Sequence, residues 1–201
     1  MPSEKLNDFG LYFITDSTLT RKSVIEDVKS AIKAGAKIIQ YREKHKSTSE
    51  MIKEAEEINI LCQRNNILFL VNDRIDIALA VDADGVHLGE EEDMPYKYAR
   101  KLLGNNKFIG LSAHSVKDAL KNEKIGADYT SIGPIHFTTT KKNGHKPIGL
   151  KPIRQLKNEL KIPFFAIGGI NEANIGSVLK AGAKNVAIIS AIVAKDDVEK
   201  A

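Results

Sequence analysis

Short apolar runs alternate with longer amphipathic segments along most of the chain. The apolar runs predict eight strands, at residues 11–16, 37–42, 67–71, 85–89, 108–112, 129–135, 162–167 and 185–190. Between them, apolar residues recur at helical spacing and predict seven helices, at residues 21–34, 48–65, 75–80, 94–103, 116–125, 150–160 and 172–181. Strict alternation of strand and helix is typical of a parallel sheet, and eight such units indicate an α/β fold closed into a compact (β/α)8 TIM barrel.

The ends of the predicted helices support this division. Residues 34–37, 125–128 and 181–184 each carry a Gly-Ala pair just before a strand, where glycine can take the positive φ that ends a helix. We predict a single TIM-barrel domain, residues 1–201. Only eleven residues follow Ser190, so the eighth helix is expected to be short, missing or truncated. The alternative is an open doubly wound sheet, which would favour a glycine-rich turn after the first strand, but residues 16–19 contain no glycine.

Composition and charge narrow the possible functions. Hydrophobic residues make up 42% of the 201 residues and charged residues 28%, which is ordinary for a globular protein with a large core. The formal net charge is +4, but no basic run is interleaved with aromatic residues and there is no Trp, so we expect no nucleic-acid partner. A small positive excess fits small anionic substrates.

Two features bear on location and redox chemistry. No stretch is apolar over the length that a membrane span requires, and the first residues lack the apolar core of a signal peptide, so we expect no membrane partner and a cytoplasmic location. The one cysteine, Cys62, falls within the predicted helix 48–65 and is expected to be a buried structural thiol.

Polar side chains gather where the second strand ends. In a parallel barrel the carboxyl ends of all strands face one common mouth, where catalytic residues lie. Alternation along a strand places Gln40, Arg42 and Lys44 on one side. Two cations and an amide there predict a receptor for a di- or triphosphate and a polar ring, although a solvated strand end would also carry such residues.

Carboxylates follow the next two strands. Asn72 and Asp73 end the third strand, and an acidic turn at residues 90–93 follows the fourth. Carboxylates beside cations suit Mg²⁺ held between protein and pyrophosphate oxygens. The acidic turn also fits the beginning of a helix, whose dipole favours negative charge.

The last strands end in residues that suit a second anion. Thr138, Thr140 and Lys141 follow the sixth strand, and hydroxyl and ammonium groups can converge on an oxyanion. Gly169 ends the seventh strand and Ser190 the eighth, which is the usual phosphate site of such barrels. A solvated polar turn is the plainer alternative. His87 and His114, within or just after strands, are interpreted first as hydrogen-bonded structural residues.

Taken in order, these motifs resemble the thiamine-phosphate synthase family, whose fold is a TIM barrel. The matching segments are residues 11–16, 40–44, 72–73, 84–89, 112–114, 133–135, 138–141, 168–170 and 189–192. The resemblance implies a transferase that joins hydroxymethylpyrimidine pyrophosphate to thiazole phosphate. The products would be thiamine phosphate and pyrophosphate, with Mg²⁺ as cofactor. The implied mechanism ionises the bond between the pyrimidine methylene and oxygen, after which the thiazole nitrogen attacks.

The resemblance also implies a role for each site residue. The pyrimidine pyrophosphate would be held by Gln40, Arg42, Lys44, Asn72, Ser112 and Lys141. The thiazole phosphate would be held by Thr138, Thr140, Gly169, Ile189 and Ser190. Mg²⁺ would be held by Asp73 and Glu92. The catalytic contribution would come from Lys141, Ser112, Arg42 and Lys44.

Two positions depart from the family pattern. The second metal ligand is usually an Asp, whereas its position here falls on Glu92, with Asp93 one residue later. His136 and Phe137 stand where the family usually carries an aromatic residue and Pro, and we expect a looser loop before Thr138 without the loss of a ligand.

Other functions remain open from the sequence. A thiazole tautomerase of the sister family would depend on a histidine such as His114, but would not need the residues for pyrophosphate and metal. A non-catalytic barrel that binds a thiamine precursor, and a sugar-phosphate isomerase, are further alternatives. The sequence also leaves a homo-oligomer open.

Overall fold

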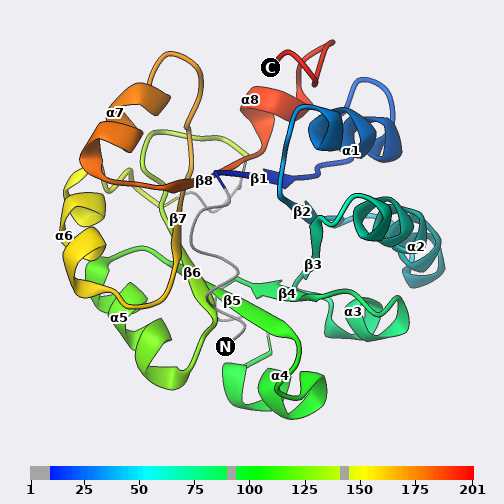
Figure 1. The fold of residues 1–201 in the computed structure, drawn as a ribbon, viewed down its shortest axis with the longest axis horizontal. Helices are drawn as coiled ribbons and strands as arrows, with labels where there is room; N and C mark the ends of the chain where they lie inside the picture. The colour runs from blue at the N-terminus through cyan, green and yellow to red at the C-terminus, as the bar shows by residue number, and fades with distance from the viewer. Residues whose placement is uncertain (1–9, 90–93, 141–144) are drawn as a thin grey trace.

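Eight parallel strands close into a barrel in chain order in the computed structural model, which describes residues 10–89, 94–140 and 145–201 (Figure 1). The strands are β1 (Leu11–Ile14), β2 (Ile38–Tyr41), β3 (Leu68–Asn72), β4 (Gly85–Leu88), β5 (Phe108–Ala113), β6 (Tyr129–Ile132), β7 (Phe164–Ile167) and β8 (Asn185–Ile188). Each strand pairs with the next, and β8 pairs with β1, with Ala187 opposite Tyr12. The predicted TIM barrel is confirmed.

Helices surround the barrel between successive strands (Figure 1). They are α1 (Val24–Lys33), α2 (Thr48–Arg64), α3 (Ile75–Ala80), α4 (Tyr96–Leu103), α5 (Val116–Ile125), α6 (Lys151–Glu159), α7 (Ile175–Ala181) and α8 (Ser190–Val193). The eighth helix is therefore present but short. No described helix is long and apolar enough to cross a membrane.

The boundaries of several elements differ from the sequence-based prediction for local reasons. Helix α4 begins after Pro95, which acts as its N-cap, and not at residue 94. Strand β8 ends at Ile188, and Ser190, predicted to lie at the strand end, is the first residue of α8. Where side-chain caps are present, they follow the sequence: Ser47 and Glu50 form a capping box at the start of α2.

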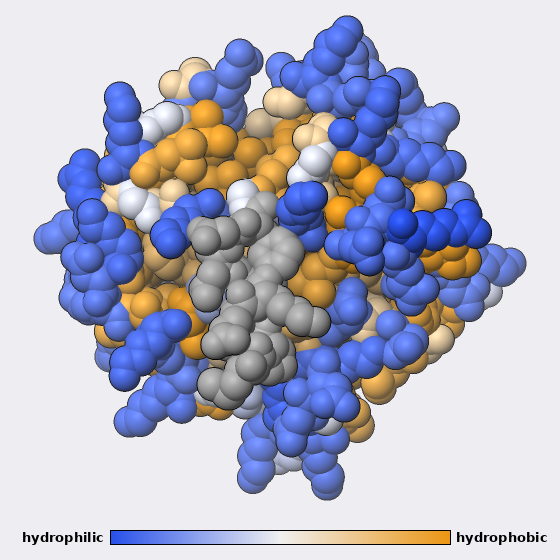
Figure 2. Space-filling view, in the orientation of Figure 1, coloured by the Kyte–Doolittle hydropathy of each residue, from blue (hydrophilic) through white to orange (hydrophobic). Residues whose placement is uncertain are grey.

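Alternation along the strands creates two apolar layers. Phe13, Ile39 and Val71 face the helices, whereas Tyr12 and Ile38 fill the interior of the barrel. On the face shown in Figure 2, hydrophilic side chains form the outer rim and hydrophobic residues lie inside it. The barrel is thus a packed core whose interior becomes polar only near its mouth.

Candidate active site

A pocket lies at the carboxyl ends of the strands, and each strand contributes to its lining. Most of the predicted site residues line it: Gln40, Arg42, Asn72, Ser112, Thr138, Thr140, Gly169, Ile189 and Ser190. Asp73 lies beside the pocket, since it accepts a hydrogen bond from the side chain of the lining residue Asn72. Lys44 lies next to Asp73 and donates to it. Glu92 and Lys141, with the acidic turn at residues 90–93, lie outside the described residues.

Arg42 is held by a carboxylate that the sequence-based prediction did not include. Its Nη1 atom donates to Oδ2 of Asp16 at 2.6 Å, and the two side chains are 14% and 6% exposed. The other carboxylate oxygen of Asp16 accepts from the backbone N–H and the hydroxyl of Thr18. Arg42 therefore lines the pocket in a fixed orientation. The sequence did contain one indication that Asp16 belongs to the site, since it is a carboxylate at the end of a predicted strand.

Lys44, Asn72 and Asp73 meet at the ends of β2 and β3, as the sequence suggested. Both Lys44 Nζ and Asn72 Nδ2 donate to Oδ2 of Asp73. Lys44 is 47% exposed, so this cation lies at the rim of the pocket, whereas Asp73 is 16% exposed.

Glu43 shapes the loop that carries Lys44. Its carboxylate accepts the backbone N–H groups of Lys44 and His45, each at 2.7 Å. Burial by itself would raise the pKa of Glu43, but hydrogen bonds from the Ser17 side chain and from these amides outweigh burial and lower the pKa below its ordinary value. Glu43 therefore stays ionised and holds the turn together.

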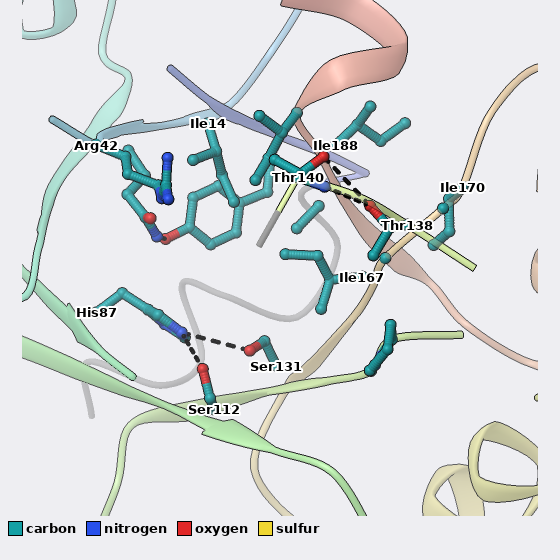
Figure 3. Close-up of a pocket in the computed structure, with 18 of the residues that line it drawn as sticks. Ile14, Arg42, His87, Ser112, Ser131, Thr138, Thr140, Ile167, Ile170 and Ile188 are labelled. Atoms are coloured by element: carbon teal, nitrogen blue, oxygen red, sulfur yellow. Dashed lines mark hydrogen bonds between the residues drawn. The ribbon is translucent and has the colours of Figure 1, made fainter. Parts of the chain in front are cut away.

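Three hydroxyl groups converge on the other side of the pocket, where Figure 3 shows Thr138 and Thr140 across from Arg42. Thr138 Oγ1 donates to Thr140 Oγ1 at 3.2 Å, and Thr140 Oγ1 donates to Ser190 Oγ at 3.3 Å. Gly169 has φ +64°, and a Cβ atom there would lie 2.4 Å from the carbonyl oxygen of Phe137. Only glycine fits at this position, which lets two loops approach closely beside the hydroxyls.

His87 belongs to a buried polar network in the floor of the pocket. Its Nε2 atom lies 3.1 Å from Ser112 Oγ and 3.4 Å from Ser131 Oγ (Figure 3), and its Nδ1 atom lies 3.1 Å from the hydroxyl of Tyr129. Tyr129 in turn lies 3.0 Å from the hydroxyl of Tyr12. The sequence-based prediction assigned no role to either tyrosine, although a buried phenol needs a partner for its hydroxyl.

His114 and His145 also line the pocket, whereas Cys62 does not. His114 Nδ1 lies 2.6 Å from the carbonyl oxygen of Gly133, and its ring stacks on that of the exposed His145, with centroids 3.8 Å apart. Cys62 is buried in α2, as expected, and burial raises the pKa of its thiol to about 12. A thiol in this state is a poor nucleophile at neutral pH.

This barrel places cations and a carboxylate on one side of a single mouth, and hydroxyls and a close-packed glycine on the other. That combination is typical of barrel enzymes that act on small anionic molecules. The chain belongs to the thiamine monophosphate synthase family, whose model matches residues 11–192.

Similar proteins agree with this family over nearly the whole chain. The thiamine-phosphate synthase of Methanosarcina mazei is 52% identical over 195 residues, which cover 97% of this chain and 80% of the relative. That of Methanosarcina barkeri is 50% identical and covers 98% and 89% of the two chains. The solved structure of thiamine phosphate pyrophosphorylase from Pyrococcus furiosus has a TM-score of 0.89 and 42% identity, covering 98% of this chain and 93% of that one. The resemblance found in the sequence is confirmed, and so is the class of enzyme, a transferase of thiamine biosynthesis.

Proposed function

We propose that the protein joins hydroxymethylpyrimidine pyrophosphate to a thiazole phosphate, forming thiamine phosphate and releasing pyrophosphate. The observation that carries the proposal is that, in a chain of this family, one mouth combines a cationic side with a hydroxyl side. Arg42 and Lys44 belong to the first side, and Thr140 and Ser190 to the second. Two anionic substrates would each find a receptor there, with their reacting groups between them.

The pyrimidine pyrophosphate would lie on the side of β2, β3 and β5. Arg42 and Lys44 supply positive charge for the pyrophosphate, and Lys141 would add to it from the loop after β6. Gln40, Asn72 and Ser112 line the same side and offer neutral hydrogen-bonding groups for the remaining polar atoms of this substrate.

The thiazole phosphate would lie against the ends of β6, β7 and β8. Thr138, Thr140 and Ser190 offer hydroxyl donors, and Gly169 and Ile189 contribute backbone at the same place.

The residues beside β3 fit Mg²⁺. Hard divalent cations prefer oxygen ligands, and the carboxylate of Asp73 already holds a cation, the ammonium group of Lys44. We infer that Asp73 and Glu92 would hold Mg²⁺ together with pyrophosphate oxygens. When bound, Mg²⁺ would neutralise negative charge on the departing pyrophosphate.

The proposed reaction needs no protein nucleophile. The bond between the pyrimidine methylene carbon and the pyrophosphate oxygen breaks, and its electron pair leaves with pyrophosphate. The thiazole nitrogen then supplies the electron pair of the new C–N bond. Arg42, Lys44 and Lys141 would stabilise the charge that develops on the leaving group, while Ser112 holds the same substrate in place.

A thiazole tautomerase, the main alternative, would leave the cluster of Lys44, Asn72 and Asp73 without a task. A cytoplasmic location and a homo-oligomeric state stay predictions from the sequence.

The direct test mixes the purified full chain with both phosphorylated precursors and MgCl₂ and follows thiamine phosphate and pyrophosphate by chromatography. Equimolar formation of both products is expected, and no product in the presence of active precursors would refute the function. Asp73→Asn should lose most of the Mg²⁺-dependent turnover, and a rate within a few-fold of the unmodified protein would contradict the metal assignment.

A matched pair of substitutions tests the phosphate side. Thr140→Val removes a hydroxyl that lines the pocket, whereas Thr139→Val makes the same change at an exposed neighbour outside the lining. Thr140→Val should raise KM for the thiazole phosphate about tenfold, the effect of losing one hydrogen bond to a charged group. Equal KM values for the two variants would show that Thr140 does not bind this phosphate.

A further inference from the structure

Five side chains form a continuous hydrogen-bonded series across the interior of the barrel, from Gln40 on β2 to Ser112 on β5. Gln40 Nε2 donates to the hydroxyl of Tyr12 at 2.5 Å. The hydroxyl groups of Tyr12 and Tyr129 are 3.0 Å apart, and that of Tyr129 is 3.1 Å from His87 Nδ1. His87 Nε2 is 3.1 Å from Ser112 Oγ. Gln40, Tyr12, His87 and Ser112 all line the pocket, and Tyr129 joins them without being part of the lining.

The two tyrosines are fixed in place and keep their protons. Tyr12 and Tyr129 are 1% and 0% exposed, and both rings pack edge-to-face against Phe165, with centroids 5.1 and 5.3 Å away. Gly110 leaves room for the second ring, since a Cβ atom there would lie 1.9 Å from Cζ of Tyr129. Burial raises the pKa of both phenols above the ordinary value, so each hydroxyl has one proton to donate at neutral pH.

The chemistry of each group gives the series a direction. An amide nitrogen can only donate, so Tyr12 accepts from Gln40. Either phenol could donate in the pair of Tyr12 and Tyr129, but the reverse direction would leave the proton of the buried Tyr12 without an acceptor in the series, so we assign Tyr12 as the donor. Tyr129 then donates to His87 Nδ1, which must be the unprotonated nitrogen of the ring. The proton of neutral His87 is therefore on Nε2, and we assign its acceptor as Ser112 Oγ at 3.1 Å, the nearer of two hydroxyls, the other being Ser131 Oγ at 3.4 Å.

The direction decides what the two ends offer to a ligand. Ser112 accepts from His87 and so has its hydroxyl proton to donate to the pocket. Gln40 uses one N–H of its amide on Tyr12, so its amide oxygen is not used in the series and can accept from a ligand. With Gln40 in the opposite orientation every bond of the series would reverse, and both ends would change character.

We propose that Tyr12, Tyr129 and His87 are positioning residues that make Gln40 an acceptor and Ser112 a donor toward the substrate. The matching ligand has an amino group at one edge and a hydrogen-bond acceptor at the other, as an aminopyrimidine carrying a pyrophosphate does. In assigning Gln40 and Ser112 to this substrate, the inference rests on the function proposed above.

The first measurement is the protonation pattern of His87 in the full chain. Long-range ¹H–¹⁵N spectra of protein labelled with ¹⁵N-histidine, at about pH 8 where imidazole is neutral, distinguish the two tautomers. The signals of His87 are those absent from the spectrum of His87→Gln. The expected form is Nε2–H, and an Nδ1–H ring in the unmodified protein would overturn the proposal. This measurement needs no turnover, so its failure is distinct from a failure to form thiamine phosphate.

Two substitutions then separate the ends of the series. Tyr129→Phe removes the donor to His87, so we expect the tautomers to mix and KM for the pyrimidine pyrophosphate to rise about tenfold, while KM for the thiazole phosphate stays within about twofold. Tyr12→Phe removes only the partner of Gln40. It should raise the same KM but leave the Nε2–H form of His87 intact, because Tyr129 still donates to it.

Tyr41→Phe is the matched control. Tyr41 is fully buried on β2, but its hydroxyl donates to Glu54 Oε2 at 2.8 Å, outside the pocket lining. The Tyr41→Phe variant loses one partly buried hydrogen bond through the same chemical change and should alter neither the His87 signals nor KM for the pyrimidine pyrophosphate. Effects of Tyr129→Phe no larger than those of Tyr41→Phe on both readouts would reduce the series to a structural role and refute the proposal.

Discussion

Two aspartate–cation pairs at the mouth of the barrel should contribute very differently to stability. Asp16 pairs with Arg42, and their side chains are 6% and 14% exposed. Asp73 pairs with Lys44, and their side chains are 16% and 47% exposed. Replacing each aspartate by asparagine removes one charge at nearly constant shape, and burial is the main difference between the two pairs.

The magnitudes follow from the atoms involved. In Asp16→Asn, Oδ1 can still accept from Thr18, but an NH₂ group replaces the oxygen that faces Arg42, so donor faces donor. A hydrogen bond between charged groups contributes about 1.5–3 kcal/mol, and Arg42 keeps some access to water from the pocket, so we expect a loss of about 2 kcal/mol. In Asp73→Asn the partner is half exposed, and the loss should stay below about 0.5 kcal/mol.

Urea unfolding followed by circular dichroism measures both effects. With a slope of about 2.5 kcal/mol per molar urea, Asp16→Asn should lower the midpoint by about 0.8 M and Asp73→Asn by less than about 0.2 M. The slopes should match that of the unmodified protein. Equal shifts, or a larger shift for Asp73→Asn, would refute the argument that burial sets the value of these pairs.

Three further predictions concern packing, the cysteine and the metal. Gly110→Ala should destabilise the protein by about 2 kcal/mol or more because its Cβ would meet the ring of Tyr129, whereas Gly176→Ala in α7, with no atom within 4 Å of its Cβ, should be neutral or stabilising in the same urea assay. Cys62, with its pKa raised to about 12, should stay protonated and unreactive toward a disulfide reagent at about pH 8 in the folded protein and react fully in urea; rapid reaction of the folded protein would contradict its burial. Chelation by EDTA should abolish formation of thiamine phosphate and excess MgCl₂ should restore it, and unchanged turnover in EDTA would exclude the metal proposal.

The fold was predictable because its signals are local and repeated. Each strand is a short apolar run, and most helices show apolar residues at helical spacing, so errors at single boundaries do not change the count of units. The boundaries moved where a single residue decides them. Pro95 is the N-cap of α4, so the helix begins one residue later. The chain turns after Ile188, so Ser190 is the first residue of a helix and not the last residue of a strand. The pattern of hydrophobic residues does not indicate where single residues cap a helix or turn the chain.

Only the part of the candidate site that consists of residues at or just after strand ends could be predicted from the sequence. Lys44, Asn72 and Asp73 meet because the ends of neighbouring parallel strands must meet. Thr140 reaches Ser190 across β7, which lies between β6 and β8, because all strands of the barrel end at one mouth and the segment after β6 extends over it. Asp16 was missed although β1 and β2 are neighbours, because a lone carboxylate at a strand end does not indicate its partner.

The polar role of the two buried tyrosines was missed for a different reason, which follows from closure of the barrel. Tyr12 and Tyr129 occupy inward positions of β1 and β6 with the same alternation as Ile38 and Leu70, so by pattern they are core residues. The pattern is right, because their rings do pack in the core. Their hydroxyl groups become meaningful only when closure brings β1, β4 and β6 around one interior, where a phenol must find a partner. In a closed barrel, therefore, a tyrosine at an inward position just below the mouth is itself a signal for a polar network under the site, and the partner to seek is an inward His or Gln on another strand.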